Sequence, residues 1–180
     1  MPKKFKMNRK MYVVLLLLVI VSLFIAIKNI NAQTHVESKS FDLMLSTLLA
    51  HSVKEVGVTD VVNDTTGIFL DSRELKEYEV SHIKDAIWVG YEDFNVTRVQ
   101  NIASDEKIIV YCSVGYRSEK IAEKLLGLGF TNVVNLYGGV FEWVNQDKPV
   151  VDQTGNNTDL IHAYSKKWGI WLNEGVKVYD

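Results

Sequence analysis

The chain has 180 residues, 47% of them hydrophobic and 23% charged, which is room for one globular domain and not comfortably two. The net charge of −2 is unevenly spread: residues 1–32 hold six basic residues and no acid, so residues 33–180 carry 14 basic and 22 acidic residues. The resulting net charge of −8 argues against a nucleic-acid partner, which requires a basic face, and the single cysteine excludes an internal disulfide.

Residues 11–27 are an unbroken apolar run, and five of the positive charges precede it. Positive charge stays on the cytoplasmic side of a membrane, so we expect the N-terminus inside and the remainder exported. The run lies at the low end of the spanning range and slightly above a typical signal-peptide core. We therefore predict that residues 1–32 are a signal anchor with an N-terminal hydrophobic helix, or alternatively a cleaved signal peptide. The domain is then expected on the periplasmic side of the membrane, or periplasmic or secreted after cleavage.

Residues 33–55 are predicted to be a linker and a packing helix. The first eight are mostly polar, and positions 41–49 then place their large apolar residues on one side of a helix. These residues are Phe41, Leu45, Leu48 and Leu49. We expect this amphipathic helix to pack on the domain that follows.

From residue 53 onward, apolar strand-like runs alternate with helical patterns. The predicted strands cover residues 53–62, 68–70, 86–89, 107–111 and 132–136. A helix is predicted after Asp71 or Ser72, because either side chain can cap its N-terminus, and a second helix is predicted at 119–126. The pattern at 91–103 is more weakly helical, and residues 140–145 are predicted to face inward. This alternation favours an α/β fold with a mostly parallel central sheet flanked by helices.

The only cysteine, Cys112, stands between the strand at 107–111 and the helix at 119–126. A tight loop at the start of a helix directs backbone N–H groups and the positive end of the helix dipole toward this position. Arg117 adds a permanent charge, so the loop favours the thiolate form. Cys112 is therefore the predicted catalytic residue, although a lone cysteine is more often a small buried apolar residue.

The rest of the loop is predicted to bind the substrate. These residues are Ser113, Val114, Gly115, Tyr116, Arg117 and Ser118. Gly115 suits a backbone turn with unusual angles, and Ser118 is either a hydroxyl donor to bound sulfur or a helix cap. No cysteine or histidine cluster has zinc spacing and no glycine-rich phosphate motif is present, so neither a metal nor a cofactor is predicted.

At these residues the sequence resembles the rhodanese-like sulfurtransferases. The resemblance covers residues 56–150 and rests on short motifs in the family's order: 71–74, 77–78, 81–86, the loop 112–118, 129–130, 133–139 and Trp143. It implies a rhodanese-like fold, places Asp71 and Arg73 beside the active loop as support, and places His82 in a structural turn. The chain departs from the family at Ser81 and Asp85, where glycine is common.

The resemblance implies a sulfurtransferase that takes sulfane sulfur from thiosulfate or a persulfide donor. Cys112 would hold the sulfur as a persulfide and pass it to a thiol or cyanide. The spacing from Cys112 to Arg117 is Cys-x4-Arg, whereas the related phosphatases carry Cys-x5-Arg, and the shorter loop fits one sulfur atom better than an oxyanion.

The alternative is a non-catalytic rhodanese-like binding or regulatory module in the cell envelope, which would be expected to lose Cys112 or Arg117. A disulfide oxidoreductase is disfavoured because the chain has no second cysteine. Residues 151–180 lie outside the resemblance and carry Trp168 and Trp171. We expect this C-terminal extension to pack on the domain, with partner binding as the alternative.

Overall fold

The computed structural model describes residues 36–180. The apolar run at 11–27 and the first residues of the linker lie outside the described residues. Within residues 36–180, none of the helices combines the length and the apolar character needed to cross a bilayer.

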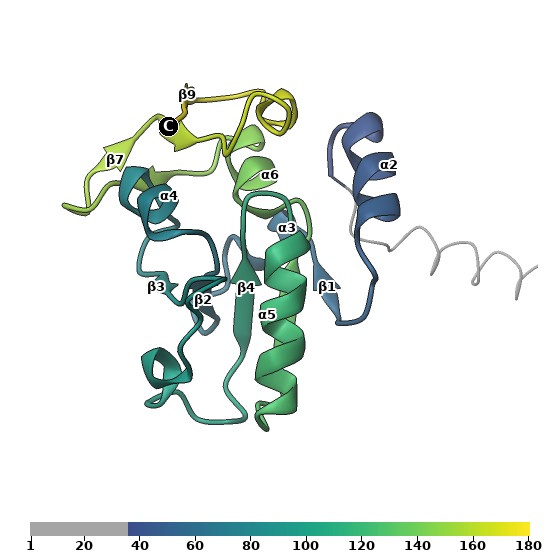
Figure 1. Cartoon of the computed structure of the whole chain (residues 1–180), viewed down its shortest axis with the longest axis vertical. Helices are drawn as coiled ribbons and strands as arrows, with labels where there is room; N and C mark the ends of the chain where they lie inside the picture. The colour runs from purple at the N-terminus through teal and green to yellow at the C-terminus, as the bar shows by residue number, and fades with distance from the viewer. Residues whose placement is uncertain (1–35) are drawn as a thin grey trace, which may run out of the picture. The chain divides into compact units, whose positions relative to one another are not determined.

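A five-stranded parallel sheet forms the centre of the domain, which confirms the predicted α/β architecture (Figure 1). Its strands, in spatial order, are β1 (Glu55–Val56), β5 (Val133–Leu136), β4 (Ile108–Tyr111), β2 (Ile68–Asp71) and β3 (Ile87–Trp88). The central strands β4 and β5 are buried along their whole length, as expected of a parallel sheet covered on both faces. Asp71 pairs with Tyr111, so the loops after β2 and β4 leave the sheet at the same level.

Alternate residues of β4 enter two separate apolar clusters, one on each face of the sheet. Ile108 and Val110 face the long helix α5 (Tyr116–Gly127), which runs beside β4 in Figure 1. Ile109 and Tyr111 face the second cluster. That cluster takes residues from α2 (Lys39–Leu48), α3 (Val58–Val61), α6 (Gly139–Asn145) and the C-terminal extension. The extension is therefore part of the hydrophobic core.

Several predicted boundaries differ from the structure. The strand expected at 53–62 is only β1, because Gly57 ends it and begins the short helix α3, with its amide donating to Asp60. The segment 91–103 holds one 3-10 turn, η1 (Val96–Val99).

The helix α4 (Leu75–Val80) is capped by Glu74 and not by Asp71 or Ser72 as predicted. Both predicted caps have other partners. The Asp71 carboxylate binds Arg73, and the Ser72 hydroxyl donates to the carbonyl of Tyr111 on the neighbouring strand. These tertiary contacts leave neither side chain available to the helix.

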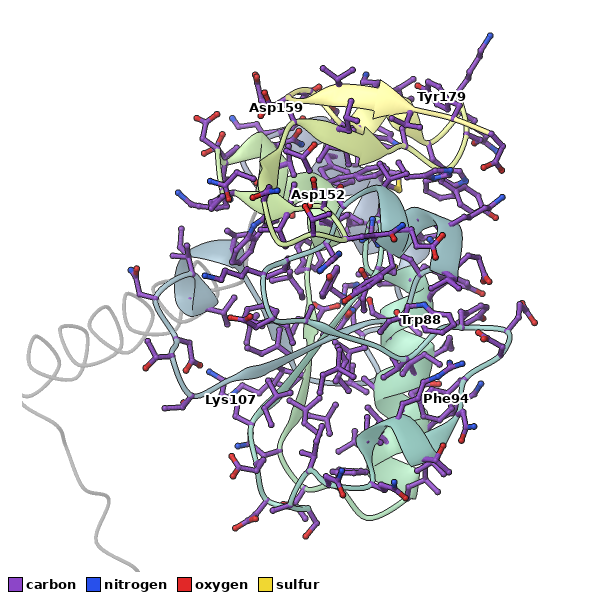
Figure 2. The ribbon with its side chains drawn as sticks, turned by 90° about the vertical axis from the view of Figure 1, so that its left-hand side faces the viewer. Trp88, Phe94, Lys107, Asp152, Asp159 and Tyr179 are labelled. Atoms are coloured by element: carbon purple, nitrogen blue, oxygen red, sulfur yellow. The ribbon has the colours of Figure 1, made fainter. Side chains whose placement is uncertain are left out.

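The C-terminal extension adds two small sheets and a 3-10 turn. β6 (Val150–Val151) pairs with β7 (Asn157–Thr158), and β8 (Leu160–His162) pairs with β9 (Val176–Val178). The segment 165–172, which carries the two tryptophans, forms turns and η2 (Gly169–Trp171). Figure 2 shows Asp159 and Tyr179 of the extension at one end of the domain, and Lys107, which precedes β4, toward the other. The extension thus lies over the carboxyl end of the central strands, where the loop 112–118 is located.

Candidate active site

Cys112 directly follows β4 and lines a pocket of about 380 Å³. The residue is only 1% exposed, yet it is not enclosed by the apolar core, because Ser113, Val114, Tyr116 and Arg117 line the same pocket. The sulfur-bearing residue therefore shares a cavity with the loop that was predicted to bind the substrate.

One donor of the loop contacts the sulfur: the Gly115 amide donates to Cys112 Sγ at 3.2 Å. The Ser118 hydroxyl lies 3.6 Å from the sulfur, but it donates its hydrogen to Asn135 Oδ1 at 2.7 Å. Gly115 has φ +120°, a conformation that residues with a Cβ rarely adopt, so glycine is required for this contact. Tyr116 and Arg117 begin α5, where amide groups have no partner within the helix and favour an anion.

The loop carbonyls have partners elsewhere. The amides of Val140 and Phe141, at the start of α6, donate to the carbonyls of Cys112 (2.8 Å) and Ser113 (3.1 Å). This pairing requires close approach at Gly139, where an added Cβ would lie 2.4 Å from the Cys112 oxygen. The carbonyls at the start of the loop are thus bound by α6, while the Gly115 amide donates to the sulfur.

Arg117 does not point a free guanidinium into the pocket. Its Nη1 and Nη2 donate to the two carboxylate oxygens of Glu77 at 2.6 and 2.9 Å, and Nη2 also donates to Ser113 Oγ at 2.9 Å. Ser113 Oγ in turn donates to Glu77 at 3.1 Å. This bidentate pair ties the active loop to α4, and the Tyr164 ring lies over the guanidinium at 5.0 Å.

Both partners of this pair have shifted pKa values. Burial raises the pKa of Glu77, but the hydrogen bonds and charge of Arg117 outweigh it and leave that pKa below its ordinary value. Burial lowers the pKa of Arg117, but the carboxylate of Glu77 and the nearby Cys112 outweigh that effect and raise it. The pair is therefore ionised at neutral pH.

Asp71 and Arg73 form a second ion pair, fully buried, with 2.6 Å between the Asp71 Oδ2 and Arg73 Nη2 atoms. Arg73 Nη2 also donates to the carbonyl of Ser81 at the end of α4. Among residues 36–180, no hydrogen bond joins this pair directly to the loop 112–118. The pair instead contacts Tyr111, the residue before Cys112, because the Arg73 guanidinium lies 5.7 Å from the centroid of its ring and Asp71 pairs with it in the sheet.

The two departures from the family's glycines have local explanations. Ser81 has φ −169°, extended backbone that any residue adopts. Asp85 has φ +63°, which aspartate tolerates better than most residues. His82 stacks on Tyr78 and forms a backbone bridge with Val151, so it lies in a structural turn.

Sequence reasoning missed three contributors to the site: Glu77, Asn135 and Tyr164. Asn135 accepts from the Ser118 hydroxyl at 2.7 Å and donates to the Gly115 carbonyl at 3.0 Å. A single polar residue in a fully buried strand was the available signal for Asn135. Glu77 belongs to the 77–78 motif of the family resemblance, but that motif did not indicate its partner. Nothing in the sequence pointed to Tyr164.

The described part of the chain contains no group of three or more histidine, cysteine, aspartate or glutamate side chains placed to hold a metal ion. The candidate site therefore consists of a single cysteine, the N–H groups of its loop and a buried ion pair.

Comparisons with known proteins show which sequences and folds this chain is similar to. Two curated relatives are named tRNA uridine(34) hydroxylase. The protein of Hamiltonella defensa subsp. Acyrthosiphon pisum is 37% identical over 56% of this chain, and that of Yersinia enterocolitica is 31% identical over 63%. The chain covers only 28% and 33% of their own lengths.

A protein of Bacillus halodurans with a known crystal structure has the same fold. It matches with a TM-score of 0.52 and 23% identity, over 65% of this chain and 87% of that one. The family model described as "Rhodanese-like domain" matches residues 57–146, half of the chain, and includes the complete active loop. The chain therefore belongs to the rhodanese-like domain family.

Proposed function

We propose that the protein is a sulfurtransferase that moves sulfane sulfur from thiosulfate or a persulfide donor to a thiol or cyanide acceptor. Cys112 would carry the sulfur as a persulfide. The observation that carries this proposal is the position of Cys112 Sγ beside a cavity, within reach of the Gly115 amide and the Ser118 hydroxyl.

In the first half-reaction the Cys112 thiolate attacks the outer sulfur of the donor. A new S–S bond forms, the donor's S–S bond breaks, and sulfite or a thiolate leaves with the electron pair. In the second, the acceptor attacks the outer sulfur of the persulfide and returns Cys112 to the thiolate. N–H groups of the loop and of the first turn of α5 stabilise the charge in both steps. Arg117 holds this loop against Glu77.

We also propose that the domain is exported and attached to a membrane through residues 11–27, as the charge distribution around that run predicts. The tRNA modification named for the two relatives is not proposed here. Residues 33–180 have a net charge of −8, which disfavours binding to the phosphates of an RNA.

Replacing the sulfur nucleophile tests the proposed function. Cys112→Ser is expected to abolish sulfur transfer to cyanide from thiosulfate and from a persulfide donor, because serine cannot form a persulfide. The folded structure should persist, as measured by circular dichroism and the urea unfolding midpoint. Ile170→Ala, an exposed change on the extension, is the control and should retain full turnover.

Mass spectrometry of the donor-treated wild type should find one additional sulfur atom on Cys112. Unchanged turnover in Cys112→Ser would refute the mechanism. Failure of the wild type to accept sulfur from any donor would instead favour the non-catalytic binding or regulatory module.

A further inference from the structure

The pocket beside Cys112 is only partly built by the rhodanese-like region. Leu48 of α2 and Tyr164 and Trp168 of the C-terminal extension line it, and all three lie outside the matched residues 57–146. The two segments that flank the family region thus form part of the wall around the reactive sulfur. Part of the shape of this pocket is therefore set by residues outside the matched family region.

The charges around the pocket are unfavourable for a small dianion. Arg117 is the only basic residue that lines it, and both terminal nitrogens of Arg117 already donate to Glu77. Glu74 and Glu92 line the same pocket and add negative charge. A dianionic ligand therefore has two carboxylates nearby, and the charge of the guanidinium that lines the pocket is already paired with Glu77.

The remaining walls are mostly apolar and aromatic. Leu48, Val114 and Trp168 present apolar side chains, and Tyr91 and Tyr164 add aromatic rings. A volume of about 380 Å³ lies near the lower end of pockets that bind small organic molecules. The space greatly exceeds that needed for one sulfur atom, and its surface suits an uncharged hydrocarbon or aromatic group.

We propose that the physiological sulfur partner of Cys112 is an organic thiol, with its persulfide, whose body is apolar or aromatic and carries no anionic group. This inference rests on the proposed sulfur-transfer function and specifies the substrate class. The thiolate RS⁻ attacks the outer sulfur of Cys112–S–SH, the S–S bond of Cys112 breaks, and RSSH and the Cys112 thiolate form. The reverse reaction loads the protein, and neither direction requires an oxidant or a reductant.

Discharge of a preformed persulfide measures this preference directly. The full-length protein is loaded with inorganic polysulfide, desalted, and mixed with 2-phenylethanethiol, 2-mercaptoethanol or mercaptosuccinate. The RSSH product is trapped by alkylation and quantified by mass spectrometry. To correct for intrinsic reactivity, the rate for each thiol is divided by the rate at which the same thiol reacts with glutathione persulfide in the absence of protein. We expect 2-phenylethanethiol to be preferred about tenfold or more over 2-mercaptoethanol, and mercaptosuccinate to be slowest.

Two pairs of variants locate the effect. Trp168→Ala should reduce the preference for the aromatic thiol, whereas Ile170→Ala, an exposed residue of the same segment that does not line the pocket, should retain it. Glu92→Lys should raise the rate with mercaptosuccinate several-fold. Glu79→Lys makes the same charge change at an exposed position outside the pocket and should not.

Each outcome decides the proposal. Equal normalised rates for the aromatic and the small thiol in the wild type would overturn the substrate class while leaving sulfur transfer intact. A protein that neither loads sulfur nor discharges it to any thiol would refute the proposed function itself. If Trp168→Ala does not fold, the wild-type rates and the exposed pair Glu92→Lys and Glu79→Lys still decide the result.

Discussion

At the scale of single residues, Glu77 determines the electrostatics of the site. Its two oxygens accept from the Glu74 amide, Ser113 and both terminal nitrogens of Arg117. A buried carboxylate with four donors is stable only while it is charged and paired. The loop arginine therefore acts chiefly to hold the loop against α4, and the donor in contact with the sulfur is the Gly115 amide.

The Glu77–Arg117 pair predicts a pH dependence of stability. The folded-state pKa of Glu77 lies below its ordinary value of 4.5, so its stabilisation is complete above that value and is lost as pH falls through the lower folded pKa. Glu77→Gln should reduce the free energy of unfolding by about 3 kcal/mol at neutral pH, because Arg117 loses its buried partner. Urea unfolding should show this difference narrowing as the pH falls below 4.5 and through the lower folded pKa of Glu77.

Glu79→Gln, an exposed change on the same helix, is the control and should alter the unfolding free energy by less than about 0.5 kcal/mol. A difference between wild type and Glu77→Gln that stays constant with pH would show that the carboxylate is not the titrating group.

At the scale of elements, the site depends on the contact between the active loop and the start of α6. Gly139 has φ +58° and lies against the carbonyls of Cys112 and Ser113. Both conditions exclude a side chain: one is conformational and the other steric. The absence of a side chain at Gly139 therefore has a chemical consequence, because it lets the start of α6 bind the carbonyls of the active loop.

Two glycine substitutions separate this contact from a general effect of alanine. Gly139→Ala should destabilise the fold by several kcal/mol, of the order of the larger core mutations, and reduce sulfur transfer more than tenfold in the protein that remains folded. Gly127→Ala, in the last turn of α5 with nothing within 4 Å of the added Cβ, should stabilise it by about 0.5–1 kcal/mol. Chemical denaturation and the cyanide assay measure both effects. Equal stabilities for the two variants would contradict the role given to Gly139.

The strand–loop–helix around Cys112 and the parallel sheet were predictable, because apolar strands alternating with helical patterns permit few other arrangements. The partners of individual side chains were not. Asp71 and Ser72 have the residue types of helix caps, and only the pairing of β2 with β4 and the position of Arg73 give them other partners. The role of Glu77 depends in the same way on α4 lying beside the loop, which local sequence does not encode.

At the scale of the whole molecule, the two segments outside the family region meet on one side of the domain. Phe41 of α2 stacks on Trp171 of the extension, with ring centroids 5.4 Å apart. Asn145 of α6 also donates to the Trp171 carbonyl and accepts from the Asn173 amide. Since Leu48 and Trp168 line the pocket, this contact connects the stability of the flanking segments with the shape of the site.

A double-mutant cycle between Phe41 and Trp171 measures that connection. Phe41 is buried, so Phe41→Ala should lower the free energy of unfolding by about 3–5 kcal/mol, whereas Leu43→Ala, 69% exposed on the same helix, should change it by less than about 0.5 kcal/mol. Stacked rings contribute beyond their buried area, so Phe41→Ala and Trp171→Ala should be non-additive by about 0.5–1.5 kcal/mol. Strict additivity would mean that α2 and the extension pack independently. In that case the Phe41→Ala variant should also keep its preference for an aromatic thiol. If the two segments are coupled, the Phe41→Ala and Trp171→Ala variants should both lose that preference.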